Sequence, residues 1–406
     1  MLDKFYENLL GLTDGWFVED VNQDNSSQEV TVRIAYNNLI QKCPKCGKEA
    51  FLNDIRERTI QHKDTCDYKT FLLVKYPRVK CQRCGTQAIA PPFAAANSRF
   101  TKSFERRIIE LCYSSSIQKV ARDLGLNWHV IEGIKRRAVR RGIERQRQRP
   151  GKKVKNIAID EVSFRKYHDY LTIITDKDRG HVIGVLHDRT AEALTNFLTT
   201  QQVADFTELK SISMDMWSPY IKAIRDYFPN ADQLICFDRF HVAQLINRAL
   251  DMVRRRESAA FNTKANPLKG TRFEWLRNSG KIDNRTRRKF FEITRMPLLT
   301  AKAWRLKELA CTLWNYQKEG SALKAWLNLI KQLKQSKIDE LKKLSKTIGY
   351  HLHGILNSIR LRANNGLAEA RNSCIQRIKQ MACGFRNKDR FATEIIYQYG
   401  GLNMTF

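Results

Sequence analysis

Residues 154–164 read VKNIAIDEVSF, and this stretch decides the fold class of the central part of the chain. An apolar run that leads into the carboxylate of Asp160 is typical of a buried β-strand. Two more strand patterns follow, DYLTIITD and HVIGVLHD, and a turn at Asp178-Arg179-Gly180 joins them. Beyond them, AEALTNFLTT and PYIKAIRDYF have helical patterns, whereas LKSISMD and QLICFDRF have strand patterns.

A meander of three strands followed by alternating helix and strand is the order that a ribonuclease H-like α/β fold requires. In that fold Asp160 lies on the first strand and Asp215 at the end of the fourth, and these two strands are central neighbours. Three other strand-end acids, Asp176, Asp188 and Asp238, compete for the same role. An ordinary strand-end or capping function is the alternative for each acid taken alone.

The composition indicates a polyanionic partner. The chain has 406 residues, enough for two to four domains, and its 72 Lys and Arg outnumber 42 Asp and Glu, for a formal net charge of +30. Such an excess favours nucleic acid and makes binding salt-dependent. A solvated basic surface or an anionic membrane is the alternative, but the basic residues cluster beside motifs. No apolar run approaches the ~20 residues that span a bilayer. The N-terminus lacks a signal-peptide pattern, so we expect a reducing cytoplasm.

Two C-x-x-C-G knuckles, CPKCG and CQRCG, are separated by 34 residues. Each tight turn brings two thiolates together, and two such turns complete a tetrahedral Cys₄ shell for a structural Zn²⁺. The predicted ligands are Cys43, Cys46, Cys81 and Cys84. Coincidence or a redox pair is the alternative. His62 and Cys66 lie between the knuckles and are substitute ligands in principle, although their spacing does not support it.

Residues 117–137, IQKVARDLGLNWHVIEGIKRR, fit a helix-turn-helix with Gly125 in the turn. Ala121 is small enough for a close helix crossing, and Ile131 and Ile134 bury the second helix. SFERRIIELCY would be a preceding third helix. A generic helical hairpin is the alternative, but the adjacent basic run favours DNA binding.

The second helix of this motif carries the predicted DNA contacts. Polar Asn127, Trp128 and His129 near its start would enter a major groove, and the basic tail would hold phosphates. The predicted phosphate contacts are Lys135, Arg136, Arg137, Arg140 and Arg141. A linker is expected at 145–155, where Pro150 and Gly151 break any helix.

Several motifs of the chain read MDMWSPYIKAIRDYFPNADQLICFDRFHV, IDEVSFRKYHDYLTIITDKDRG and NNGLAE, with GFRN after it. These motifs closely resemble bacterial insertion-sequence transposases of the ISL-three family. The similarity extends over nearly the whole chain. It implies an α+β multidomain DDE transposase with a zinc ribbon, a helix-turn-helix and a ribonuclease H-like core interrupted by an all-helical insertion. It also implies that Asp160, Asp215 and Glu369 are the catalytic, metal-binding triad.

The domains expected from this resemblance and the sequence pattern are five. They are a zinc ribbon (1–95), a helix-turn-helix with basic linker (96–150), the first part of the core (151–240), the helical insertion (241–366), and the last core helix with a tail (367–406). Residues 367–400 read as a single amphipathic helix and tail.

The resemblance implies an enzyme that binds the terminal repeats of its element and transfers strands to target DNA with two Mg²⁺ ions, or Mn²⁺ in their place. Joining two ends implies at least a homodimer on double-stranded DNA, in the bacterial cytoplasm at the nucleoid. The alternatives are an inactive or regulatory DNA-binding relative and a nuclease without strand transfer.

Four residues near the expected site carry open predictions. Where the family tends to have E-G-x-N, this chain has Glu369-Ala370-Arg371-Asn372, and Arg371 and Asn372 are expected to contact DNA. His241 follows the fifth strand and is either a DNA contact or a structural hydrogen-bonder. Trp217 either stacks on a base or packs beneath the site, and packing is favoured.

Overall fold

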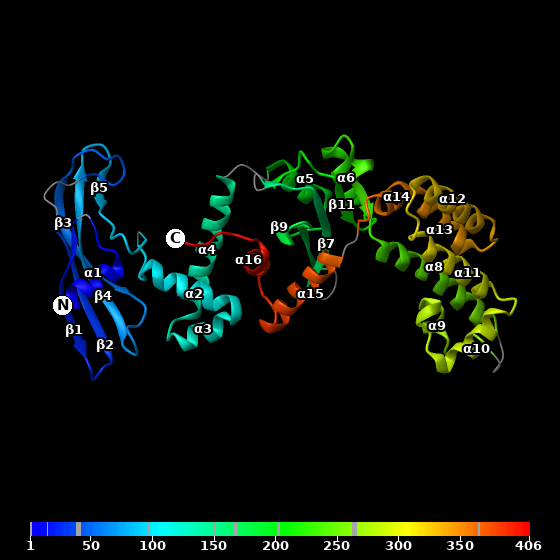
Figure 1. Cartoon of the computed structure of the whole chain (residues 1–406), viewed down its shortest axis with the longest axis horizontal. Coiled ribbons are helices and arrows are strands. Elements are labelled where there is room, and N and C mark those ends of the chain that lie inside the picture. Colours follow the sequence, from blue (N-terminus) through cyan, green and yellow to red (C-terminus); the bar gives the residue numbers. More distant parts are fainter. Residues whose placement is uncertain are drawn as a thin grey trace. The chain divides into compact units, whose positions relative to one another are not determined.

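The computed structural model describes residues 2–13, 15–37, 42–95, 97–148, 152–165, 169–200, 204–261, 266–363 and 366–406 (Figure 1). The chain divides into two compact units. Unit 1 comprises Met1–Gly142 with Asn403–Phe406, and unit 2 comprises Ile143–Leu402. Among the described residues, no helix is long and apolar enough to cross a membrane.

Unit 1 begins with a helix and a five-stranded sheet. Its elements are α1 (Leu2–Leu10), β1 (Trp16–Asp24), β2 (Glu29–Tyr36), β3 (Phe51–Gln61), β4 (Lys69–Cys81) and β5 (Gly85–Ala88). The strand order is β1-β2-β4-β3, and β5 pairs with β4. Alternate residues of β2 and β4 are buried, as period-2 strands on a one-sided core require. The first knuckle lies between β2 and β3, and the second is the β4–β5 turn, so the sheet places both cysteine pairs together.

Three helices follow the sheet: α2 (Lys102–Ser114), α3 (Ile117–Asp123) and α4 (Trp128–Arg147). Gly125 has φ +64°, a conformation that glycine adopts without steric cost, and it turns the chain between α3 and α4. Ile131 and Ile134 are fully buried and Ala121 is 6 % exposed. The predicted helix-turn-helix, with its preceding helix, is therefore confirmed. Pro150 and Gly151 of the predicted linker lie outside the described residues.

Unit 2 contains a second five-stranded sheet with the order β12-β11-β7-β8-β9. The strands are β7 (Asn156–Arg165), β8 (Asp169–Asp176), β9 (His181–Leu186), β11 (Ser211–Met214) and β12 (Ile235–Phe237). The first three form an antiparallel meander, whereas β11 is parallel to both β7 and β12. A short parallel pair, β6 (Lys152–Lys153) and β10 (Ala204–Asp205), lies outside this sheet. The strands occur in the predicted order, and β7 and β11 are neighbours.

Helices cover both faces of this sheet, because strands such as β7 carry apolar side chains on both faces. Ile157 and Ile159 pack into the core formed with α5 (Ala191–Thr200) and α6 (Ser218–Tyr227). Val162 and Phe164, which have the opposite parity along the strand, pack against α15 (Gly366–Met381) and α16 (Lys388–Tyr399). Figure 1 shows α15 beside β7.

The prediction of a single helix over 367–400 is wrong, because the structure has two, α15 and α16. The chain bends at Cys383 (φ +52°) and Gly384 (φ +93°), a left-handed turn that ends α15. Phe391 and Ile395 of α16 are fully buried against the sheet. This second helix is therefore part of the core and not a tail.

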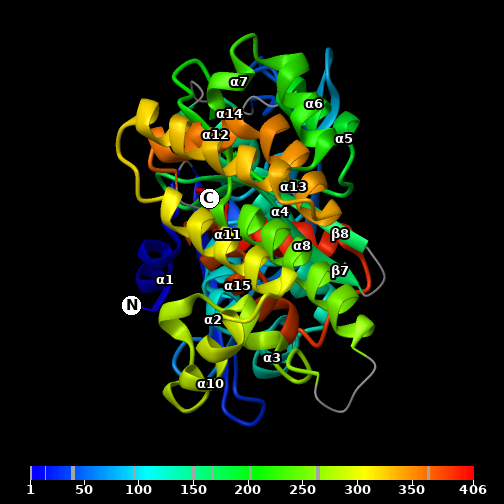
Figure 2. The same cartoon turned by 90° about the vertical axis from the view of Figure 1, so that its right-hand side faces the viewer.

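Between the sheet's last strand and α15 the described chain is helical, as predicted. The elements are α8 (Arg239–Ala260), α9 (Arg272–Leu276), a 3₁₀ turn η1 (Ser279–Lys281), α10 (Asn284–Thr294), α11 (Leu299–Leu313), α12 (Glu319–Gln335), α13 (Asp339–Tyr350) and α14 (Leu352–Arg360), whereas the short helix α7 (Ala231–Leu234) directly precedes the last strand, β12. α8 and α11 lie side by side in both views (Figures 1 and 2). Trp275 is fully buried and Trp304 is 7 % exposed, and both rings pack on Phe290. Both tryptophans are therefore core residues.

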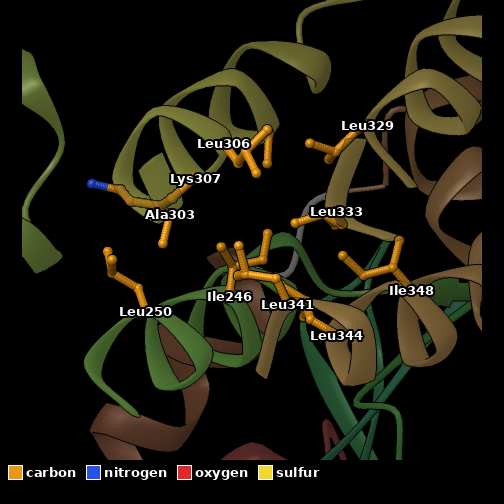
Figure 3. Close-up of a pocket in the computed structure, with 11 residues that line it drawn as sticks. Ile246, Leu250, Ala303, Leu306, Lys307, Leu329, Leu333, Leu341, Leu344 and Ile348 are labelled. Carbon is orange, nitrogen blue, oxygen red and sulfur yellow. The ribbon is translucent and has the colours of Figure 1, made fainter. Parts of the chain in front are cut away.

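A small apolar cavity lies among α8, α11, α12 and α13 (Figure 3). Leucine, isoleucine and alanine side chains line it, and the stem of Lys307 closes one side while its nitrogen points away. That Nζ donates to the carbonyl oxygens of Trp275 (3.3 Å) and Arg277 (2.5 Å) and pairs with Glu308 (2.6 Å). Lys307 thus ties α11 to the end of α9, and the cavity is a packing defect of the core.

Helix α14 closes the open edge of the sheet at β12. Asn357 Nδ2 donates to the carbonyl oxygens of Asp232 and Ile235 (both 2.8 Å), and Ser358 Oγ donates to that of Phe237 (2.7 Å). Gly354 lets the Phe237 ring approach, since a Cβ there would lie 2.4 Å from it. The helical region therefore fixes the end of β12, next to the acids described below.

Candidate active site and metal centre

Three aspartates lie within electrostatic range of one another where the parallel pairing of β7, β11 and β12 ends. Ser213 of β11 pairs with Ala158 on one side and with Cys236 on the other. Continuing this register by two residues brings Asp160, Asp215 and Asp238 to the same level on three adjacent strands. The Asp238 N–H donates to the carbonyl of Met214 (3.2 Å), which keeps the β11–β12 pairing in register up to that point. Asp238 was only a competing acid in the sequence, and the structure adds it to the row.

Asp160 lies on the face of the sheet that α15 covers. Its Oδ1 accepts the Glu161 N–H (2.8 Å), and its Oδ2 accepts from Nδ2 of Asn372 (2.6 Å). Burial raises the pKa of Asp160, and the charges of Asp215 and Asp238 raise it further. The Glu161 N–H and His241 act in the opposite direction on this pKa. The carboxylate is therefore held in place by α15 in a crowded negative environment.

Asp215 follows β11 and accepts the Trp217 N–H at Oδ1 (3.1 Å). Burial also raises the pKa of Asp215, and His241 and Arg189 lower it. His241 is in the first turn of α8, and Asp238 caps this helix by accepting the Phe240 N–H (3.0 Å). The structure thus brings His241 within electrostatic range of both Asp160 and Asp215.

Glu369 is placed differently from the two aspartates. It is exposed on the first turn of α15, one turn before Asn372. Among the described residues, the cysteine cluster is the only group of three or more potential metal ligands whose donor atoms all lie within 4.8 Å of one another. The two aspartates and Glu369 therefore do not converge that closely, although α15 carries Glu369 on the helix that contacts Asp160.

Arg371 holds α15 against the sheet. Its Nη2 donates to the Gly180 carbonyl (2.5 Å) in the β8–β9 turn, and its guanidinium lies over the Tyr399 ring at 4.2 Å. Lys379, two turns later, donates to the Ser163 carbonyl (2.9 Å). These contacts set the position from which Asn372 reaches Asp160.

The four knuckle cysteines form one cluster. Their sulfur atoms all lie within 4.8 Å of one another, and the Cys46 and Cys81 sulfurs are 3.7 Å apart. Tetrahedral Zn–S bonds of about 2.3 Å place ligand sulfurs about 3.8 Å apart, so this donor set fits Zn²⁺. The backbone N–H groups of Cys84 and Arg83 lower the pKa of Cys81 to about 7. The contact with Cys46 and burial raise the pKa of Cys84 to about 12, because a further thiolate needs a neutralising cation.

The two substitute ligands are not part of this cluster. His62 is buried, and its Nδ1 is 2.9 Å from Oγ1 of Thr101. Burial lowers the pKa of His62 to about 4. Cys66 is exposed.

The predicted DNA contacts on α4 differ in accessibility. Arg136, Arg137 and Arg140 are exposed, and Arg137 also pairs with buried Glu105 (2.8 Å). Arg141 donates to the Met404 carbonyl (3.4 Å) and lies over the Phe406 ring at 3.9 Å. These contacts show that the basic residues of this helix do not form one uniform face.

Lys135 requires a correction. It is only 4 % exposed, so its ammonium does not lie on the surface that would face phosphates. At the start of the helix, Asn127 and His129 are exposed and Trp128 is half-buried. Asn127 Oδ1 accepts the His129 N–H (2.9 Å), which caps the helix.

Comparison with known proteins matches all three parts of this architecture. A transposase family profile matches residues 157–395, more than half of the chain. A profile for the helix-turn-helix domain of transposase family ISL3 matches residues 89–139, and one for the zinc-finger of transposase IS204/IS1001/IS1096/IS1165 matches residues 41–84. The chain belongs to the ISL3 family of transposases.

Individual relatives cover nearly the whole chain. The transposase for insertion sequence element IS1001 of Bordetella parapertussis is 26% identical over 410 residues, which is 99% of each chain. The transposase for insertion sequence element IS1557 of Mycobacterium tuberculosis is 24% identical over 418 residues, covering 95% of this chain and 92% of that one. The zinc-ribbon domain with its four-cysteine cluster supports a structural zinc in this ISL3 transposase, and the helix-turn-helix supports DNA binding.

One cluster of this ISL3 transposase was missed by the sequence reasoning. Glu161 pairs with Arg189 (2.7 Å) and accepts from the Tyr220 hydroxyl (3.2 Å), which is also 2.7 Å from Oγ1 of Thr172. Glu161 follows Asp160 directly, and strand alternation sends it to the α6 side of the sheet. The adjacent acids Asp160 and Glu161 were the signal that the sequence offered. Arg189 and Tyr220, which contact Glu161, come from distant segments of the chain.

Proposed function

We propose that this chain binds the terminal repeats of its insertion sequence, cleaves DNA at the element's ends and transfers the freed strand to target DNA. The row of Asp160, Asp215 and Asp238 on adjacent parallel strands is the observation that carries the proposal. The strand order supports a ribonuclease H-like core, and the names of the two relatives support the reaction. In this proposal Asp160, Asp215 and Glu369 are the catalytic, metal-binding acids.

The donor set of the core fits divalent magnesium, with Mn²⁺ as a substitute. Asp160 and Asp215 offer hard carboxylate oxygens. Burial penalises both of their charges, and the charge of Asp215 further penalises that of Asp160, until a cation is near. Two bound ions would supply an activated oxygen nucleophile and charge neutralisation at the leaving oxygen. Glu369 would complete the ligand set from the first turn of α15.

The chain's own residues prepare this reaction. Asn372 holds one oxygen of Asp160, leaving the carboxylate in a defined orientation. His241 is in electrostatic range of both aspartates and would contact the phosphodiester that they flank. No Ser or Tyr nucleophile is needed, because water and then the freed 3′-hydroxyl are the attacking groups.

The rest of the molecule binds and positions DNA. α4 would enter the major groove with Asn127, Trp128 and His129 and hold phosphates with Arg136, Arg137 and Arg140. Joining two ends calls for at least a homodimer on DNA, and the substrate places the enzyme in the bacterial cytoplasm at the nucleoid. We retain the five predicted domains, with two helices in the last one.

A DNA-binding regulator and a nuclease are the competing functions, and one experiment separates them. Linear DNA carrying the element's ends is incubated with the protein and Mg²⁺, and the products are resolved on a sequencing gel. We expect nicking at the end followed by joining to a second DNA. Binding without nicking would identify a regulator, and nicking without joining would identify a nuclease.

Replacing Asn372 by alanine should lower the cleavage rate by about 10–100-fold, because groups that orient metal ligands typically contribute that much. The part of DNA-end binding that depends on α4 should not change, since that helix is untouched. Single-turnover cleavage at saturating protein measures the rate. The matched control is Asn247→Ala, an asparagine on α8 of the helical region. Equal rates for Asn372→Ala and wild type would contradict the role of this contact.

Replacing Arg136 and Arg140 by glutamine should weaken binding to end-containing DNA and to unrelated DNA alike. Each lost phosphate contact lowers the slope of log K against log salt by about 0.9. Fluorescence anisotropy over a salt series measures both quantities. Lys119→Gln on α3 is the comparison variant, since it removes one charge outside α4. An unchanged slope in the double variant would show that α4 does not face the DNA backbone.

A further inference from the structure

Trp217 is an exposed aromatic residue beside the aspartate row. It lies two positions after Asp215, and its side chain is 38 % exposed. The indole is therefore only partly covered, whereas the sequence had favoured packing beneath the site. An indole exposed next to half-buried acids therefore calls for another explanation.

The backbone of Trp217 and its indole ring are held by separate contacts. The backbone N–H donates to Oδ1 of Asp215 (3.1 Å), and the indole Nε1 donates to the Arg189 carbonyl (3.3 Å). The Arg189 guanidinium lies over the ring at 4.3 Å. A ring fixed in this way loses little side-chain entropy when a ligand binds its exposed surface.

Arg189 is itself held by contacts with Glu161 and Tyr170. Its Nε pairs with Glu161 (2.7 Å), and its guanidinium also lies 5.3 Å from the centre of the Tyr170 ring. Glu161 is held by the Tyr220 hydroxyl (3.2 Å). A chain of contacts thus runs from the meander and α6 to the indole, so the support belongs to the rigid core.

We propose that the exposed surface of Trp217 stacks on a nucleobase adjoining the phosphodiester at Asp160 and Asp215, and that Arg189 is the positioning residue for the ring. This inference rests on the proposed function. An indole offers no charge for a phosphate, whereas every base has a π-face that stacks on it regardless of sequence. Because a base inside a duplex has both faces covered, the ligand is an unstacked base at the strand end.

The test uses 2-aminopurine placed singly at each position flanking the element's end. Its fluorescence is quenched by stacking, and it is read in Asp160→Asn protein so that binding is observed without cleavage. We expect one position to change on binding, the change to vanish in Trp217→Ala and to persist in Trp217→Phe. Tyr316→Ala, which removes another exposed aromatic residue, should leave it unchanged.

Cleavage by the otherwise native enzyme gives a second reading. Losing one stacked base should lower kcat/KM on the order of tenfold to a hundredfold in Trp217→Ala, with partial recovery in Trp217→Phe. Arg189→Gln should weaken the fluorescence change while leaving DNA affinity through α4 intact.

Two outcomes would overturn the proposal: no position responds in the protein that keeps Trp217, or the response survives in Trp217→Ala. These two outcomes are distinguishable from a failure of the proposed cleavage function. If the base signal depends on Trp217 but the native enzyme cuts no end-containing DNA, stacking stands and the cleavage assignment fails. Melting curves of the variants exclude unfolding as the cause of a lost signal.

Discussion

Asp160→Asn and Asp215→Asn proteins should each lose at least about a thousandfold in DNA cleavage while binding end-containing DNA normally. The substitution keeps the shape of the side chain and removes the charge that would hold a divalent cation. A bound metal supplies several kcal/mol of transition-state stabilisation, and each 1.36 kcal/mol is tenfold in rate. Cleavage of labelled end DNA with Mg²⁺, and again with Mn²⁺, measures the loss.

A charge-matched control is available in the same unit. Asp226 is an exposed acid on α6, and Asp226→Asn should cleave like wild type. Asp238→Asn tests the third member of the row, and a loss comparable to that of Asp160→Asn would make it a functional acid. Wild-type-like cleavage by either of the first two variants would end their assignment to the metal site.

Cys43→Ser protein should lose its zinc and the cooperative melting of the zinc ribbon. Structural Zn²⁺ sites contribute on the order of 10–16 kcal/mol in zinc-finger peptides, far more than the stability of a small domain. With three thiolates left, the cluster of Cys43, Cys46, Cys81 and Cys84 no longer encloses the ion. Zinc content by elemental analysis and thermal melting of the full chain report the change.

The control for the zinc prediction is Cys66→Ser. Cys66 is exposed and lies outside the cluster, so this variant should retain one zinc per chain. Chelation of wild-type protein should reproduce the Cys43→Ser phenotype and be reversed by added Zn²⁺. Zinc retention by Cys43→Ser at the wild-type level would remove the four-cysteine assignment.

Local patterns in the sequence predicted the elements well where apolar residues cluster within a short stretch. β7 and β8 contain such apolar runs and were recognised as strands, and the turn at Gly125 was recognised from its glycine. β3 was missed because nearly all of its side chains are solvent-accessible and only Ile60 is fully buried. Pairing with β4 holds β3 in place. A strand with only one fully buried side chain has no alternating apolar pattern, so the sequence does not reveal it.

The candidate site was only partly predictable. Asp160 and Asp215 emerged because each follows a strand, and strand order alone predicts that these strands are neighbours. Glu369 came from family resemblance, and its convergence with the aspartates stays a prediction. Lys135 was misjudged because a basic run reads as solvated, whereas helix α4 turns this position toward the core.

The sequence by itself determined the paired knuckles, the helix-turn-helix and the order of strands that carry Asp160 and Asp215. Each of these depends on residues close together in the chain, where spacing and periodicity are sufficient. Only the tertiary structure decided that Asp238 joins the row, that Asn372 holds Asp160 and that Trp217 stays exposed over Arg189. Those contacts depend on inter-strand register and on helix α15 crossing β7, and such long-range packing leaves no periodic trace in the sequence.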